Sequence, residues 1–302
     1  MTDILLDDVP VSKGIRGRSL WEDARRRLMR NPAAVVSLYV VAILVLIAAF
    51  GPMLWVHKID DIFRDSVGIG PTTANWHLLG TDTEGRDMVA RLIFGLRISL
   101  LVGLAATVVA LTIGVTWGAV AGFFGGIVDD VMMRIVDVLY AIPFVFFVIV
   151  LMTVVNTPDP VVKLMWIFAA IGAVEWLTMA RIVRGQTISL RRKEFVEAAR
   201  ASGAKPMEIV FRHIVPNVLG PVVVFATLNI PVIILAESFL SFIGLGVQEP
   251  LTSLGRLISD GSRQMIQAPW MLFAPAVTML VTLLALNFLG DGLRDALDPK
   301  ER

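Results

Sequence analysis

Cysteine is absent from the sequence, and charged residues make up only 18% of it. Without cysteine the chain can form no disulfide, no thiolate zinc cluster and no cysteine nucleophile. The histidines, His57, His77 and His213, are scattered, and neither an H-E-x-x-H pair nor a G-x-S-x-G turn is present. A net charge of +1 argues against a strongly basic nucleic-acid-binding protein. We therefore expect no catalytic centre, no metal site and no bound cofactor in this chain.

A phosphate-binding loop of the form G-x-x-x-x-G-K-[ST] is missing as well. Such a loop wraps backbone N–H groups around nucleotide phosphates, so its absence leaves no recognisable means of hydrolysing ATP. If the chain takes part in active transport, the energy has to come from a partner protein or from an ion gradient. Both sources stay open at this point.

Apolar residues are abundant instead, at 56% of the chain, which is too many for an ordinary soluble fold. A hydrocarbon core of about 30 Å needs roughly 20 helical residues to cross it. Six apolar runs reach that length and predict an all-α polytopic membrane protein with six transmembrane helices. Prolines inside the third and fifth runs require neighbouring helices, so we expect a bundle, with a bend at Pro143. The runs cover about residues 33–56, 98–124, 131–155, 160–182, 218–243 and 271–289.

The distribution of Lys and Arg outside these runs predicts the orientation, because cytoplasmic loops are enriched in basic residues. Residues 1–31 carry seven, residues 183–216 carry seven, and the tail after residue 290 carries three. The opposite side carries five in residues 57–97 and two in residues 244–270. Both termini and the 183–216 segment are therefore predicted to lie in the cytoplasm.

Small and acidic residues stand out within the apolar runs. Glycines recur every fourth residue on one face of the second run and its exit, and such a face lets helix backbones approach closely in lipid. Glu175 and Glu237 are costly inside a membrane and suggest function. Glu237 lies near the external end of its run and is predicted to reach water. Each acid either has a structural role or lines a polar cavity. The glycines are Gly114, Gly118, Gly122 and Gly126.

The polar segment EFVEAARASGAKPMEIVFRHIVPN, residues 194–217, interrupts two apolar runs. Residues 193–202 predict a short helix that Gly203 ends, and Pro206 begins a second short helix before Pro216 and the next run. The alanines around Gly203 leave room for another protein to approach. An amphipathic loop lying on lipid headgroups is the alternative interpretation.

The pattern E-A-A-x-x-x-G at 197–203, followed by Ile214-Val215-Pro216, resembles the cytoplasmic signature of permease subunits in binding-protein-dependent ABC importers. Further motifs are similar to the C-type permeases of peptide importers, and most similar to the oligopeptide-permease C subunits. These motifs are GTDTEGRD at 80–87, FFGGIVDDVMMRIVD at 123–137, ESFLSFIGLGVQEP at 237–250 and NFLGDGLRDALDPK at 287–300.

The resemblance implies a type I ABC importer permease fold in a bacterial inner membrane. It also implies a second permease subunit, two cytoplasmic ATPase subunits that hold ATP and Mg²⁺, and a periplasmic peptide-binding protein. Glu197, Ala198, Ala199 and Gly203 carry over as positions that couple the permease to an ATPase. The implied organisation is a cytoplasmic tail (1–32), a first transmembrane anchor (33–56), a periplasmic loop (57–97), a transmembrane core (98–290) with a coupling segment (190–216), and a cytoplasmic tail (291–302).

The GTDTEGRD motif has two interpretations: a turn that fixes the entry of the second helix, or a contact with the external binding protein. Its candidate residues are Gly80, Thr81, Asp82, Gly85, Arg86 and Asp87. Three alternatives to an oligopeptide importer stay open for the whole chain. They are a dipeptide or nickel importer permease, an ion-coupled secondary transporter or channel built on Glu175 and Glu237, and, more remotely, an intramembrane enzyme.

Overall fold

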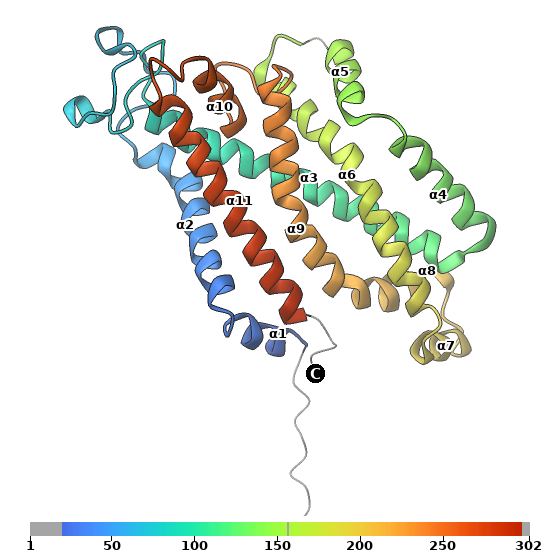
Figure 1. Ribbon diagram of the computed structural model, residues 1–302. Coiled ribbons are helices and arrows are strands. Elements are labelled where there is room, and N and C mark those ends of the chain that lie inside the picture. The colour runs from blue at the N-terminus through green and yellow to red at the C-terminus, as the bar shows by residue number, and fades with distance from the viewer. Residues whose placement is uncertain (1–19, 156, 298–302) are drawn as a thin grey trace, which may run out of the picture.

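A computed structural model describes residues 20–155 and 157–297 of the chain (Figure 1). These residues form helices and connecting loops and contain no β-strand; a single isolated bridge joins Thr81 to Asp87. Residues 1–19 and 298–302, which belong to the two predicted cytoplasmic tails, lie outside the described residues. The predicted all-α class is confirmed.

The first two helices are α1 (Leu20–Leu28) and α2 (Pro32–Leu54). The side chain of Asn31 accepts the N–H groups of Ala33 and Ala34 and caps α2. Pro32 occupies the first turn, where its missing N–H has no intrahelical partner to lose. The helix therefore begins within one residue of the first predicted run.

The second transmembrane helix, α3 (Met88–Phe124), begins ten residues before the predicted run. The carboxylate of Asp87 accepts the Ala90 N–H and caps it. At 1.5 Å per residue its 37 residues reach about 55 Å, well beyond a hydrocarbon core. Helix α6 (Pro160–Leu190), capped by Asp159, is also longer than its predicted run. Both helices therefore extend into the aqueous phases.

The third predicted span is broken. It consists of α4 (Gly126–Tyr140) and α5 (Phe144–Val155), whose axes differ by 79°. The predicted bend at Pro143 is thus confirmed and is large. Five helices are long and apolar enough to cross a membrane, and the bent pair makes up to six spans in the described residues.

After α6 the chain forms α7 (Glu194–Ala201), α8 (Pro206–Ile209), a π turn (Val210–Ile214) and α9 (Val215–Phe242). The second short helix begins at Pro206 as predicted, but it continues into the next span without a break. The π turn closes with the Val215 N–H donating to the Val210 carbonyl, and Pro216 then lies in the first turn of α9. A proline is tolerated there, so one long helix runs from Pro206 to Phe242.

Glycines bring α3 and α6 together. A Cβ added at Gly114 would lie 2.6 Å from the Met179 Cβ, and one at Gly122 would lie 2.8 Å from the Arg184 carbonyl oxygen. The glycine face therefore serves close packing within the chain. Gly126 does not belong to this face, because it has a φ of +53° and begins α4, with no atom near its Cβ position.

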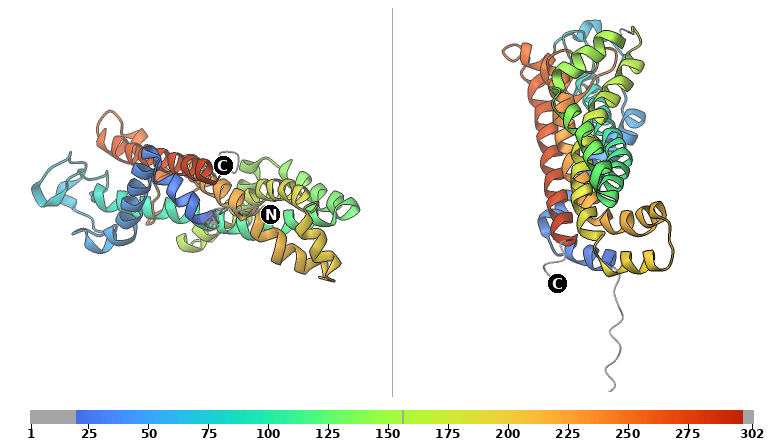
Figure 2. Two further views of the ribbon diagram at one scale, coloured as in Figure 1. Left: turned by 90° about the horizontal axis from the view of Figure 1, so that it is seen from below. Right: turned by 90° about the vertical axis from the view of Figure 1, so that its right-hand side faces the viewer.

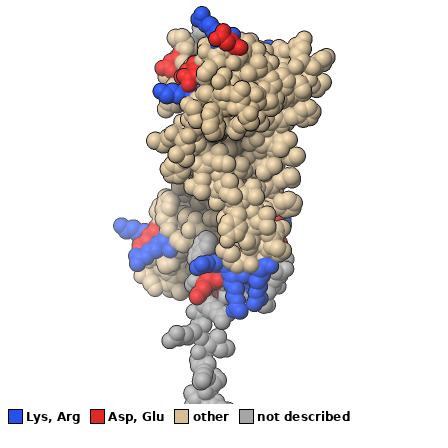
Figure 3. Space-filling model, turned by 90° about the vertical axis from the view of Figure 1, so that its left-hand side faces the viewer, with Lys and Arg blue, Asp and Glu red and all other residues tan. Residues whose placement is uncertain are grey.

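The last two helices are α10 (Leu254–Arg263) and α11 (Trp270–Leu297). Helices α1 and α7 and the end of α11 lie at one end of the bundle, whereas α10 and the long loop between α2 and α3 lie at the other (Figure 1). Figure 2 shows the α7 segment projecting to one side of the bundle. On the face in Figure 3, charged side chains gather at the two ends and an uncharged belt separates them. This is the surface of a protein that crosses a bilayer.

Candidate functional site

Helix α7 is held against the bundle by one buried side chain. Val196 is fully buried and packs in an apolar cluster with Phe123 of α3, Val183 of α6 and the residues that lead into α9. Glu197 and Ala198 are exposed, and Ala199 is half-buried. The helix therefore has one face fixed to three transmembrane helices and another face free.

The turn after α7 requires glycine. Gly203 has a φ of +80°, in the left-handed region that other residues adopt only with strain. The Ala204 N–H donates to the Ala199 carbonyl at 3.1 Å, and the Gly203 N–H donates to the Arg200 carbonyl at 3.0 Å. This is the helix ending that the sequence predicts. No atom lies within 4 Å of a Cβ added at Gly203, so the constraint is the backbone and not space.

Polar contacts connect this region to the ends of the transmembrane helices. The Arg191 guanidinium donates to the carbonyl of Gly122 at 3.1 Å and so covers the end of α3. The Arg200 guanidinium lies 5.3 Å from the centre of the Phe123 ring. Nearby, Arg184 of α6 donates two hydrogen bonds to Asp129 of α4, at 2.5 and 2.7 Å. Arg191 and Arg200 therefore fix α7 and the turn before it to the end of α3, and Arg184 joins α6 to α4.

The free side of this segment carries exposed apolar side chains beside the charged ones. Phe195 of α7, Met207 of α8 and Phe211 of the π turn are 37%, 46% and 47% exposed. Such residues projecting from the end of a membrane protein, away from the apolar belt, are typical of a surface that another protein covers.

At the opposite end of the bundle, the residues of the GTDTEGRD motif make their contacts within the chain itself. Thr81, Asp82 and Asp87 are almost completely buried, and Arg86 is 8% exposed. Asp87 accepts the Trp55 indole N–H at 2.9 Å while it caps α3. Gly80 and Gly85 have φ values of +74° and +81°. Of the two interpretations of this motif, the geometry favours the turn that fixes the entry of α3.

An ion-pair network extends from this turn to the loop before α10. Asp82 pairs with Arg86 and Arg91, and both arginines reach Glu249. Burial alone would raise the pKa of Asp82, but the charge of Arg91 and the hydrogen bonds from Arg86 outweigh it and hold the pKa below its ordinary value. The hydrogen bond from Arg86 likewise lowers the pKa of Glu249. Both carboxylates are thus charged at neutral pH.

The two acids within the spans differ from each other. Glu175 is half-buried and accepts the Asn229 amide at 2.7 Å, which links α6 to α9. Glu237 is fully buried, so the prediction that it reaches water is wrong. The reason is that α10 packs over the end of α9. Glu237 accepts hydroxyl hydrogen bonds from serines of α3 and α9, at 3.2, 3.4 and 2.6 Å from Ser99, Ser238 and Ser241.

None of these serine partners was predicted from the sequence. Ser241 lies one helical turn after Glu237, a spacing that could have signalled the contact. Ser99 lies 138 residues away, and its Oγ also accepts the Leu254 N–H of α10. Nothing in the sequence pairs it with Glu237. The network holds α3, α9 and α10 together at this end.

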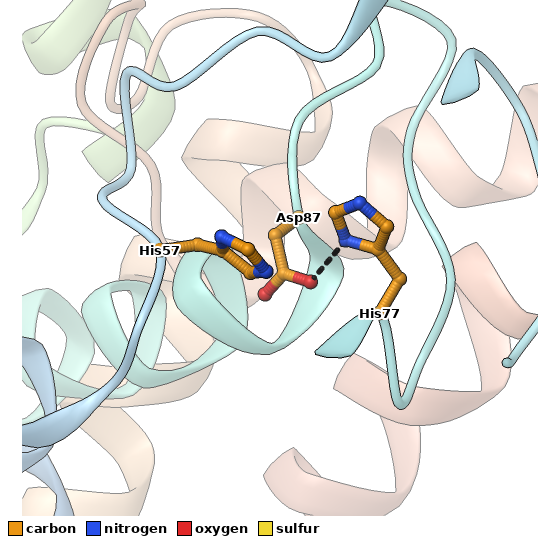
Figure 4. A group of neighbouring side chains, drawn as sticks. All are labelled: His57, His77 and Asp87. Atoms are coloured by element: carbon orange, nitrogen blue, oxygen red, sulfur yellow. Dashed lines mark hydrogen bonds and ion pairs between the residues drawn. The ribbon is translucent and has the colours of Figure 1, made fainter. Parts of the chain in front are cut away.

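Two histidines that look scattered in the sequence lie beside Asp87 (Figure 4). Their rings stack, with centroids 4.8 Å apart. His77 Nδ1 donates to Asp87 at 2.9 Å, and His57 Nε2 lies 2.7 Å from the Asn75 carbonyl. Asp87 already accepts three N–H donors, and stacked rings do not direct their lone pairs at one point. The arrangement therefore suits a loop-stabilising contact better than a metal site.

The bundle and its projecting segment define a multi-pass membrane protein with the type I ABC importer permease fold. One solved structure, an inward-facing MetNI methionine ABC transporter, matches with a TM-score of 0.54 and 20% identity over 68% of this chain and 96% of that one. At this identity the match shows the fold alone. The family model for the inner membrane component of binding-protein-dependent transport systems matches residues 114–302.

A second family model, for the N-terminal transmembrane domain of oligopeptide transport permease C, matches residues 19–69. The oligopeptide transport system permease protein OppC of Escherichia coli (strain K12) is 53% identical, over 95% of this chain and 94% of that protein. OppC of Haemophilus influenzae is 49% identical over 95% and 91%. The dipeptide permease DppC of Bacillus subtilis is 41% identical over 94% and 87%. The chain therefore belongs to the family of inner membrane components of binding-protein-dependent transport systems.

Proposed function

We infer that this chain is a permease subunit of an ABC importer that takes up oligopeptides. The observation that carries the inference is α7, a short helix fixed to three transmembrane helices through Val196, with its other face and the Gly203 turn exposed. Glu197, Ala198, Ala199 and Gly203 are the residues that contact a separate ATPase. The relatives named OppC, at 49–53% identity, support oligopeptides as the substrate class.

The complete transporter contains a second permease, two cytoplasmic ATPase subunits that bind ATP and Mg²⁺, and a periplasmic peptide-binding protein. This chain hydrolyses nothing itself, binds no nucleic acid and lies in lipid of a bacterial inner membrane with both termini in the cytoplasm. The shared end of α1, α7 and α11 supports that orientation (Figure 1). We divide the chain into a tail (1–32), an anchor (33–56), a periplasmic loop (57–97), a core (98–290) with its coupling segment (190–216), and a second tail (291–302).

The mechanism is alternating access. The peptide passes from the binding protein into a path between the two permeases, and the closure of the ATPase subunits around ATP displaces α7. Because Val196, Arg191 and Arg200 connect α7 to α3, α6 and α9, the displacement changes which side of the path is open. Glu175, half-buried between α6 and α9, is a candidate for lining that path.

Reconstitution into proteoliposomes tests the function. With the partner subunits and an external binding protein present, labelled oligopeptide should accumulate only when ATP is supplied on the α7 side. Uptake driven by a proton or sodium gradient without ATP would instead establish the ion-coupled alternative. Competition by dipeptides and by nickel ions separates the related importer classes.

A further inference from the structure

An open cavity of about 500 Å³ lies between α6, α9 and α11, at the end of the bundle that carries α7. Its wall is mainly apolar, and two polar side chains, Gln186 and Arg294, complete it. The apolar lining comes from Ile182, Pro221, Val224, Phe225, Leu228 and Leu297. None of these residues takes part in the coupling segment or in the external ion-pair network.

The polar and apolar parts of the cavity lie at different depths. Ile182 ends its apolar run, and Val224 and Leu228 lie within theirs. Gln186 lies four residues beyond the end of its run, and Arg294 five residues beyond the end of the last one. At 1.5 Å per residue both polar groups are roughly 6–8 Å outside the hydrocarbon core, which is headgroup depth.

Both polar groups are free to bind a ligand. Gln186 and Arg294 are exposed, and neither makes a side-chain hydrogen bond or ion pair with another residue in the described part of the chain. Arg294 is a permanent cation with several N–H donors, and Gln186 adds an amide donor. The mouth of the cavity therefore presents unpaired hydrogen-bond donors next to an apolar wall.

We propose that this cavity binds an anionic phospholipid of the cytoplasmic leaflet, with its phosphate at Arg294 and Gln186 and an acyl chain along α6 and α9. The hydrogen-bond donors lie at the depth of the lipid headgroups, and the apolar wall lies at the depth of the acyl chains. The cavity therefore matches a single lipid molecule in its ordinary orientation. Basic pockets between helices at the cytoplasmic surface bind such headgroups. A peptide in transit fits less well, because an apolar wall leaves its backbone N–H and C=O groups without partners.

Native mass spectrometry of the complete transporter tests the site. The complex is purified in mild detergent, stripped of lipid and titrated with phosphatidylglycerol or, separately, phosphatidylcholine. Wild type should retain phosphatidylglycerol in preference, and Arg294→Gln should weaken that binding about fivefold. Arg26→Gln is the matched control: Arg26 is exposed on α1 at the same end and does not line the cavity, so only general attraction is lost.

Photocrosslinking of the unmodified complex provides a second measurement that does not depend on any variant folding. A phosphatidylglycerol with a photoreactive acyl chain should label peptides that contain Val224 and Leu228 above the level of other lipid-facing segments. Equal loss of binding in Arg294→Gln and Arg26→Gln, uniform labelling along the helices, or labelling of the cavity by a photoreactive transported peptide in place of the lipid would overturn the proposal.

Discussion

The external loop region and the α7 segment are both rich in charge, but they use it in opposite ways. Around Asp82 the charged groups are paired with one another: Arg86 and Arg91 are buried, and both reach Glu249, whose side chain is 38% exposed. On α7 the charged side chains are exposed, and Val196 is the buried residue. The external network stabilises its own fold, whereas α7 leaves its surface available to another protein.

This difference separates two kinds of mutational effect. Changes in the external network should cost stability, because a buried charge loses its partner. Changes on the exposed face of α7 should leave stability intact and reduce coupling. The connection of α7 to the bundle, through Val196, should show the largest effect, because the coupled helices depend on it.

Val196→Asp should therefore give the largest loss. A carboxylate placed among Phe123, Val183 and Ile214 is taken out of water, which costs several kcal/mol even with Arg200 one helical turn further along α7, so α7 should detach from the bundle. Peptide uptake should fall to background while the complex still inserts, because the packing of α3 on α6 is untouched. Uptake assays beside a membrane-integration assay check this. Wild-type transport by this variant would show that α7 does not act through Val196.

Asp82→Asn should be next in size. Arg86 and Arg91 would keep their burial and lose their shared carboxylate, which costs about 3–5 kcal/mol for a buried pair. Thermal unfolding of the purified protein measures the loss. Glu84→Gln is the control, because Glu84 is 51% exposed and should contribute under about 1 kcal/mol. If both variants were equally stable, the network would be less important to the fold than its geometry implies.

Acidification should lower the stability of the external loop region more than that of the rest of the protein. The pKa values of Asp82 and Glu249 are lower in the folded protein than in the unfolded chain. Their contribution to stability is therefore fully present above the unfolded pKa of about 4 and is lost as pH falls through the folded pKa values. The protection of amides at the start of α3 against hydrogen exchange, relative to the intrinsic rate at each pH, should fall below about pH 4. In Asp82→Asn this dependence should be smaller, and an unchanged pH profile would contradict the ion-pair account.

Glu197→Gln should have the smallest effect. Glu197 is exposed, so the free energy of unfolding should change by less than about 0.5 kcal/mol. If Glu197 contacts the ATPase, the stimulation of ATP hydrolysis by the loaded binding protein should fall severalfold. Glu22→Gln, an exposed acid on α1, is the comparison. Equal stimulation in the two variants would remove Glu197 from the contact.

Much of the fold follows from the sequence for identifiable reasons. Apolar run length locates the spans, and Asn31, Asp159 and Gly203 mark helix ends because their side chains or backbone suit those positions. The 79° break at Pro143 and the π turn before Pro216 depend on packing that a proline alone does not specify.

The sites were predicted less evenly than the fold. The α7 segment is local in sequence, so its helix and its glycine turn could be anticipated, whereas the burial of Val196 depends on Phe123 and Val183 from other helices. The burial of Glu237 could not be anticipated either, because it depends on Ser99 and on α10, which come from distant parts of the chain. The stacking of His57 on His77 likewise requires the loop to fold back on itself.

The central claim, that α7 and its glycine turn transmit ATP-driven movement, is tested most directly by Gly203→Trp beside Gly244→Trp. Both glycines have φ values near +80°, at +80° and +86°, and neither has an atom within 4 Å of its Cβ position. Gly203 follows α7 and Gly244 precedes α10, and these two helices lie at opposite ends of the bundle (Figure 1). The measurement is the number of ATP molecules hydrolysed per peptide imported in proteoliposomes. Gly203→Trp should raise that ratio at least tenfold, and Gly244→Trp should leave it near the wild-type value. A wild-type ratio in Gly203→Trp would contradict the account.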